Sequence, residues 1–240
     1  AFGMNPPQSM TNSFEFSMTT PPGWSIDGTW PDGWELGEIG STSGYGPGTF
    51  HSGDHGAAIN LTTKYTNNVY THLITEEYTV PNNATARLSF RSWVCTEHNW
   101  DGGGVSISSD GGQSWWWLPP QLNGFHDQIS TVNTNSPFFG QGIIDGSSVA
   151  NGCGASNLRD FELKTYDLSN LSGQSIKARF SFFSDTYVEA DGWYIDDAGI
   201  EIDVFEPSGT WTSRSISPDP LFGYGWLDGW FEQPSGTTLL

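Results

Sequence analysis

Short runs of alternating apolar and polar residues constrain the fold of this chain more than any other feature. In the run "SIKARFSFF" (175–183), Ile176 and Phe180 fall on one face of an extended strand, and the polar residues fall on the other. The runs "ARLSFRSWV" (86–94) and "GIEIDVF" (199–205) alternate in the same way. A period of two is typical of a strand with one face in the core, so these segments are predicted to be β-strands.

The rest of the chain favours turns over helices. No window combines helical periodicity with capping residues, and the 240 residues include 30 glycines and 14 prolines. Glycine and proline separate strands and disfavour helices. We therefore expect an all-β fold in which two antiparallel sheets pack face to face in one main domain.

Both ends of the chain differ from the middle in composition. Residues 1–12 are rich in proline, glycine and polar residues and are predicted to form an N-terminal linker before a sandwich over 13–204. Residues 205–240 contain further prolines and tryptophans and end in "SGTTLL". They are either the start of a second β module or an extended tail that donates a strand to a neighbouring subunit.

The charge of the chain excludes several classes of partner. Eight Lys and Arg residues stand against 27 Asp and Glu residues, for a formal net charge of -19. Such a chain repels nucleic acid and anionic membrane surfaces, and it lacks the run of about 20 apolar residues that would insert in a membrane. Divalent cations or a saline medium would offset the repulsion, so we expect bound calcium, a marine or saline setting, or both.

Two further features concern the compartment. The N-terminus lacks the charged and apolar regions of a signal peptide, so the chain is interpreted as mature or excised material. Asn-x-Ser/Thr sequons at Asn60, Asn83 and Asn170 suit a glycosylated surface protein. Cys95 and Cys153 fit no zinc-ligand spacing, and they form either a disulfide or two buried free thiols.

Five segments in this order resemble one family of extracellular modules. They are "NSFEFSMTTPPGWSIDGTWPDGWELG" (12–37), "GPGTFHSGDHGAAINL" (46–61), "LSFRSWVCTEHNWDGGGVSISSDGGQSWWWL" (88–118), "YDLSNLSGQSIKARFSFFSD" (166–185) and "DGWYIDDAGI" (191–200). They resemble MAM-like jelly-roll modules of secreted bacterial and archaeal proteins, such as the accessory domain of immune-inhibitor-A metallopeptidases and cleaved-adhesin domains. The resemblance implies a non-catalytic jelly-roll β-sandwich within a larger protein, with calcium near the joined ends of its first and last strands.

Carboxylates in the first and last of these segments are the candidate calcium ligands. On a regular strand Ile195 and Asp197 share a face and Asp196 points to the other, so Asp197 is predicted to point inward. A buried carboxylate is costly unless it is paired or bound to a cation. The resemblance points to Glu15 and Asp197, with Asp54 as a ligand from the intervening loop. The alternative is that Asp197 only caps a turn.

The segment "DGGGVSISSDGGQSWWW" (101–117) is predicted to be a hairpin. Asp101 and Asp110 each precede glycines that accept turn conformations, and Val105 and Ile107 between them are expected to face inward. Each of these two aspartates is either a turn residue or a ligand of a second calcium ion, although the segment lacks the EF-hand pattern.

The tryptophans in and beside this hairpin leave two interpretations open. Trp115 and Trp117 point to one side of a strand and Trp116 to the other. Together with Trp100, they form a surface on which a sugar ring would stack. Alternatively, the loop from Leu118 to Ser148 folds over them with its phenylalanines.

Catalysis is not expected. His51 and His55 in "HSGDH" have the spacing of a helical zinc motif, but the segment is predicted to be a loop or strand and lacks the glutamate base. No G-x-S-x-G elbow occurs. Glu97 and Asp101 are the carboxylate pair best placed for glycosidase chemistry, a pairing that 27 acidic residues also produce by chance.

The sequence therefore predicts a non-catalytic, calcium-stabilised adhesion or structural module of a larger extracellular or cell-surface protein. Its partners would be other modules of that protein or neighbouring subunits. One alternative is a carbohydrate-binding module that binds polysaccharide through exposed tryptophans. Another is a subunit of an extracellular filament that donates its C-terminal segment.

Overall fold

The computed structural model describes residues 9–11, 21–28, 33–39, 44–82, 84–118, 127–129, 131–146 and 161–204 of the chain. Ala1–Phe205 forms one compact unit, separate from Glu206–Leu240. Among the described residues, no helix has the length and apolar character that crossing a membrane requires. The predicted linker and the predicted C-terminal module lie almost entirely outside the described residues.

The described residues form two antiparallel sheets. The six-stranded sheet has the order β12 (Glu162–Asp167), β7 (Ala84–Cys95), β14 (Gly192–Val204), β4 (His55–Ile59) and β3 (Trp34–Glu38), with β1 (Ser9–Thr11) also paired to β14. The eight-stranded sheet has the order β10 (Asp127–Ile129), β11 (Gly142–Ile144), β8 (Gly102–Ser108), β13 (Ser175–Phe183), β5 (Tyr70–Ile74) and β2 (Ser25–Gly28), with β6 (Tyr78–Thr79) on β13 and β9 (Trp116–Leu118) on β8. The one helical element described is a 3-10 turn, η1 (Ser169–Leu171).

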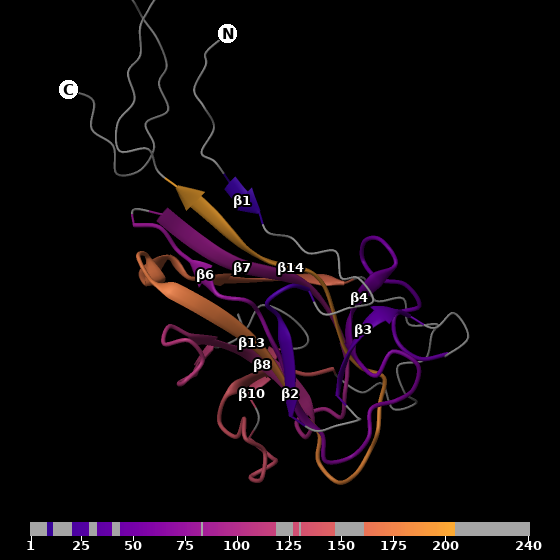
Figure 1. Ribbon diagram of the computed structural model, residues 1–240. Coiled ribbons are helices and arrows are strands. Elements are labelled where there is room, and N and C mark those ends of the chain that lie inside the picture. Colours follow the sequence, from indigo (N-terminus) through magenta and orange to yellow (C-terminus); the bar gives the residue numbers. More distant parts are fainter. Residues whose placement is uncertain are drawn as a thin grey trace, which may run out of the picture. The chain divides into compact units, whose positions relative to one another are not determined.

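The two sheets pack as layers of a jelly-roll sandwich, with β7 and β14 in one layer and β8 and β13 in the other (Figure 1). The alternation in the sequence correctly predicts which side chains lie between them. Ile176 and Phe180 of β13 are fully buried, and so are Leu88 and Phe90 of β7. The predicted all-β sandwich is therefore confirmed.

Trp193 of β14 lies at the centre of this core and is fully buried. Its ring centroid is 6.2 Å from that of Phe180, on the opposite sheet, and its Nε1 donates to Ser92 Oγ at 2.9 Å. A side-chain carbon at Gly103 would lie 2.4 Å from the Trp193 ring, which explains why β8 has a glycine there. The indole thus fills the space between the sheets.

A β-bulge interrupts β14 at its acidic pair. The strand pairs with β7 in regular register up to Asp196, and the register resumes at Gly199 after a shift. Asp197 has a φ of +48°, in the left-handed region. The inserted residue breaks the alternation of faces. The prediction that Asp197 points inward is therefore wrong: Asp196 is fully buried, whereas the Asp197 side chain is 32% exposed.

The predicted hairpin is present as β8 and β9. The two strands pair in antiparallel register, with Ser106 opposite Trp117 and Ile107 opposite Trp116. Val105 and Ile107 are fully buried, as the alternation predicts.

Candidate functional site

The bulge of β14 brings two carboxylates together with the loop before β4. The atoms of His51, Asp196 and Asp197 that could bind a metal lie within 4.8 Å of one another. The backbone nitrogen of Ser52 donates to Asp196 Oδ2 at 2.8 Å, and its hydroxyl donates to Asp197 Oδ1 at 2.6 Å. His51 Nδ1 lies 2.8 Å from Asp197 Oδ2. We call these residues the bulge group.

The bulge group contains part of the predicted calcium site. Asp196 and Asp197 are both present, and the "HSGDH" loop approaches them as expected. The loop contributes His51 and Ser52, which the sequence did not single out as ligands. The signal that could have identified them is that both residues stand in the "HSGDH" segment, next to the predicted ligand Asp54. Glu15 lies outside the described residues.

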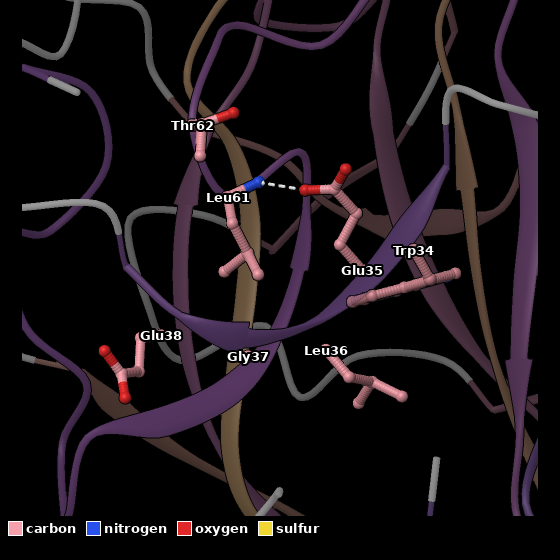
Figure 2. Close-up of a pocket in the computed structure, with 7 residues that line it drawn as sticks. All are labelled: Trp34, Glu35, Leu36, Gly37, Glu38, Leu61 and Thr62. Carbon is pink, nitrogen blue, oxygen red and sulfur yellow. Dashed lines mark hydrogen bonds between the residues drawn. The ribbon is translucent and has the colours of Figure 1, made fainter. Parts of the chain in front are cut away.

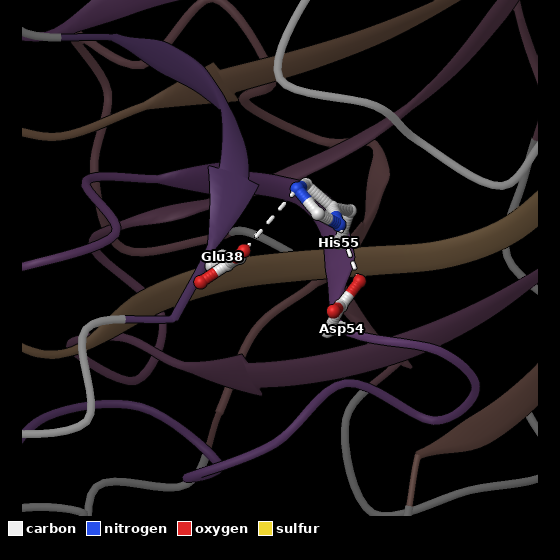
Figure 3. Close-up of side chains that lie close together, drawn as sticks. All are labelled: Glu38, Asp54 and His55. Atoms are coloured by element: carbon white, nitrogen blue, oxygen red, sulfur yellow. Dashed lines mark hydrogen bonds and ion pairs between the residues drawn. The ribbon is translucent and has the colours of Figure 1, made fainter.

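Asp54 belongs to a different group, with Glu38 and His55 (Figure 3). The His55 ring lies between the two carboxylates: Nδ1 bonds to Asp54, and Nε2 is 3.6 Å from Glu38 Oε1. The carboxylates are mostly exposed, at 78% for Asp54 and 63% for Glu38. The two histidines of "HSGDH" thus join separate groups.

A third group joins Glu97, Asp101 and Asp185, again within 4.8 Å. Asp101 is fully buried and accepts hydrogen bonds from the Tyr65 hydroxyl at 2.7 Å and from the backbone nitrogen of Asp185 at 2.7 Å. Glu97 Oε2 is buried and has no hydrogen-bond partner among the described residues. The sequence missed Asp185 because it comes from the loop after β13, 84 residues from Asp101.

Burial controls the protonation of this third group. Removal from water raises the pKa of Asp101 from 3.8 to about 7, and hydrogen bonds from Tyr65 and Asp185 oppose that rise only in part. The pKa of Glu97 is raised as well, first by burial and then by the charge of Asp185. Since Asp101 is fully buried, the carboxylate pair Glu97 and Asp101 is a poor candidate for a glycosidase, which needs both groups beside the substrate.

Asp110 closes the turn between β8 and β9. Its Oδ1 accepts from the backbone nitrogens of Gln113 and Ser114 at 3.0 and 2.9 Å, and its Oδ2 accepts from the Ser114 hydroxyl at 2.5 Å. The hydrogen bonds from Ser114 lower the pKa of Asp110 well below its usual value. Of the two alternatives for Asp110, these contacts favour the turn residue.

The tryptophans divide between covered and exposed positions. Phe138, from the loop before β11, packs on Trp117 with ring centroids 4.8 Å apart, and Trp117 Nε1 donates to the Gly142 carbonyl. Trp116 and Trp100 are 38% and 39% exposed. The covering loop thus accounts for Trp117, whereas Trp116 and Trp100 keep exposed indole surface. Trp115 is half-buried and lies against Arg179.

The remaining predicted modifications have mixed outcomes. Cys95 is disulfide-bonded; Cys153, the only other cysteine of the sequence, lies outside the described residues, as does Asn83. Asn60 is 6% exposed and its amide nitrogen donates to the Lys64 carbonyl, so a glycan would not fit there in the folded chain. Asn170 is exposed.

A depression of about 550 Å³ borders the edge strand β3 (Figure 2). The side chains of Trp34, Leu36 and Leu61 form its apolar part. Glu35 Oε2 accepts from the backbone nitrogen of Leu61 at 2.6 Å, so this carboxylate is already engaged. The depression therefore offers apolar surface and few polar groups for a ligand.

Comparison with known proteins finds a match between this chain and part of a much longer protein. It is 28% identical over 212 residues to bacillopeptidase F of Bacillus subtilis (strain 168), a match that covers 83% of this chain and 12% of that protein. The chain thus spans only a small part of the relative. No protein-family model matches the chain.

Among solved structures, the chain is similar to the K3 cleaved adhesin domain of Lys-gingipain from Porphyromonas gingivalis, with a TM-score of 0.44, 14% identity, and coverage of 81% of this chain and 98% of that one. It is also similar to TmCBM61 in complex with β-1,4-galactotriose, with a TM-score of 0.42, 13% identity, and coverage of 76% and 90%. Likenesses at this level assign no family and no function.

Proposed function

We propose that this chain is a non-catalytic binding or adhesion module of a larger extracellular protein, and that calcium at the bulge group stabilises its sandwich. The match to a small part of bacillopeptidase F supports the view that the chain is one module among several. The ordered motifs in the sequence support a MAM-like module in particular. The adjacent carboxylates of Asp196 and Asp197 are the observation that carries the calcium assignment.

The donor set of the bulge group fits calcium, which prefers oxygen ligands. Asp196, Asp197 and the Ser52 hydroxyl offer oxygens within one small volume. His51 would remain outside the coordination sphere and hold Asp197 through its hydrogen bond. Glu15 stays a predicted additional ligand. A cation here would offset the repulsion between the two neighbouring carboxylates and tie the loop before β4 to the last strand.

Calcium is expected to raise the midpoint of thermal unfolding of the wild-type chain relative to a sample in chelator. A ligand that binds only the folded state stabilises it by about 2.7 kcal/mol at a hundredfold excess over its dissociation constant. Asp197→Ala should abolish this rise. Asp54→Ala should leave it unchanged, because Asp54 belongs to another group.

Two results would overturn the assignment of calcium to the bulge group. An unfolding midpoint that does not respond to calcium would remove calcium from the proposal altogether. A response that survives Asp197→Ala and disappears in Asp185→Asn would place the ion in the third group instead.

Carbohydrate binding is the second candidate function. It is favoured by the exposed indole surface of Trp116 and Trp100, because planar aromatic faces stack on sugar rings. The third alternative, a donated C-terminal segment, stays a prediction about 205–240, which lies outside the described residues.

A further inference from the structure

The outer face of the eight-stranded sheet carries an arginine at its centre. Arg179 of β13 is paired in register with Ile74 of β5 and with Ser106 of β8, and Ile74 is paired with Ser25 of β2. These side chains therefore point to the same side of the sheet, away from the core that contains Phe180. The strands β13, β8 and β2 are labelled in Figure 1.

Arg179 stacks on an indole and forms no ion pair with the described acidic residues. Its guanidinium carbon lies 4.4 Å from the centre of the Trp115 ring. Within the described part of the chain, its guanidinium forms no hydrogen bond or ion pair, and its Nε is buried without an acceptor. Asp27 acts on it only through charge, and burial lowers the pKa of Arg179.

The buried nitrogen of Arg179 sets it apart from the other described strand cations. Acidic residues outnumber basic ones by 27 to eight, and Arg87 is paired with Glu201 at 3.4 Å and Lys164 with Glu162 at 3.2 Å. Arg91 and Lys177 form no ion pair among the described residues, but of these cations only Arg179 has a buried nitrogen without an acceptor there. A half-buried guanidinium has lost part of its hydration. A carboxylate that accepts two parallel hydrogen bonds from the guanidinium stabilises it more than a single contact would. The charge of Arg179 therefore complements a carboxylate supplied by a ligand.

The groups around Arg179 suit a sugar as the carrier of that carboxylate. Trp115 is half-buried and offers the rest of its indole surface for stacking. Ser25 is exposed and supplies a hydroxyl that can exchange hydrogen bonds with a sugar. Burial lowers the pKa of His72, on the same face, to about 4, so the positive charge of this face at neutral pH comes from Lys177 and Arg179. Asp27, in register with His72, adds one carboxylate to the same face.

We propose that Arg179 and Trp115 form a binding site for uronic-acid residues of acidic polysaccharides, in which the guanidinium holds the carboxylate and the indole packs against the sugar ring. The net charge of -19 opposes the approach of a polyanion, so this binding depends on the local contact with Arg179 and on salt that screens the long-range repulsion. The proposal rests on the second candidate function, carbohydrate binding, and specifies its ligand class. It does not involve the bulge group, which belongs to the other sheet.

Affinity electrophoresis in native gels tests this proposal. The gels contain polygalacturonate, alginate, hyaluronate or methyl-esterified polygalacturonate, with calcium kept at the lowest level that gives full thermal stability. The wild-type chain should be retarded by at least one of the three acidic polymers and not by the methyl ester. Arg179→Gln should weaken that binding by about tenfold, the value of one charge-assisted hydrogen-bonded contact.

Lys177→Gln is the matched control, because it removes the same charge from the same face two residues away and should keep most of the binding. Circular dichroism and the unfolding midpoint must show that both variants are folded. Equal weakening by both variants, or unchanged binding of Arg179→Gln, would overturn the site. Retardation by the methyl ester as strong as by the acid would overturn the uronate ligand while leaving carbohydrate binding intact. No retardation in any gel would overturn both.

Discussion

Trp193→Ala is expected to lower the free energy of unfolding by about 3–5 kcal/mol, the range for removing a large aromatic side chain from a core. The reason is that the Trp193 ring fills the space between the two sheets, against Trp34, Phe90 and Phe180. Its removal also leaves the Ser92 hydroxyl without the indole donor. Urea unfolding followed by circular dichroism measures the loss.

Two companion variants make this result specific. Tyr187→Ala removes an aromatic residue that is 73% exposed and should change stability by less than about 0.5 kcal/mol. Gly103→Ala places a carbon against the Trp193 ring and should cost about 1–3 kcal/mol through overpacking. In the Trp193→Ala background that cost should shrink because the ring is gone, but part of it should remain, because the Ser181 carbonyl oxygen would still lie 2.7 Å from the added carbon. Strictly additive costs would contradict the contact.

The sequence predicted the features of this fold that depend on neighbouring residues. Alternation within β7 and β13 identified the buried faces, because the period of a strand is a local property. The Asp-Gly turn identified the β8–β9 hairpin for the same reason. Alternation failed at Asp197, where a bulge inserts one residue, and no local signal in "YIDDAGI" marks the shift in register.

The candidate sites depended on contacts between distant parts of the chain. Asp185 approaches Asp101 across 84 residues, and His51 approaches Asp197 across 146. The order of acidic residues in the sequence does not show which of them converge. The sequence therefore grouped Asp54 with Asp197 as ligands of one calcium ion, whereas the structure places Asp54 with His55. The sequence could not show that Arg179 has a buried Nε without an acceptor among the described residues, because such an environment depends on strands that are distant in the chain.

In the presence of chelator, the free energy of unfolding is expected to fall as the pH rises from about 4 to about 7. The pKa of Asp101 is raised by burial from 3.8 to about 7, so between these values the folded chain binds a proton that the unfolded chain has lost. The contribution of protonated Asp101 to the free energy of unfolding is complete below the pKa of the unfolded state. It is lost as the pH rises through the pKa of the folded state. At about 1.4 kcal/mol per pH unit, the shift corresponds to a loss of about 4 kcal/mol.

Asp101→Asn should flatten this pH dependence, because an amide does not titrate. Its stability should also be lower at acidic pH. Tyr65 and the backbone nitrogen of Asp185 donate to different oxygens of Asp101, and the amide NH2 that replaces one of these oxygens cannot accept a hydrogen bond. Asp54→Asn changes an exposed carboxylate and should keep the decline. Urea unfolding at a series of pH values measures all three proteins. A decline that persists in Asp101→Asn would mean that another group takes up the proton.

Repeating the urea unfolding at the same pH values in calcium tests whether the third group also binds a cation. Above pH 7 the folded chain holds the charged carboxylate of Asp101 in a buried place, close to Glu97 and Asp185. A divalent cation there would favour the ionised form and lower the folded pKa of Asp101, so the decline should become smaller. Because Asp197→Ala removes a carboxylate of the bulge group, the titration in that variant tests the third group without the proposed calcium response of the bulge group. An unchanged decline would mean that this cluster serves only as a buried hydrogen-bonded support for the loops around Tyr65.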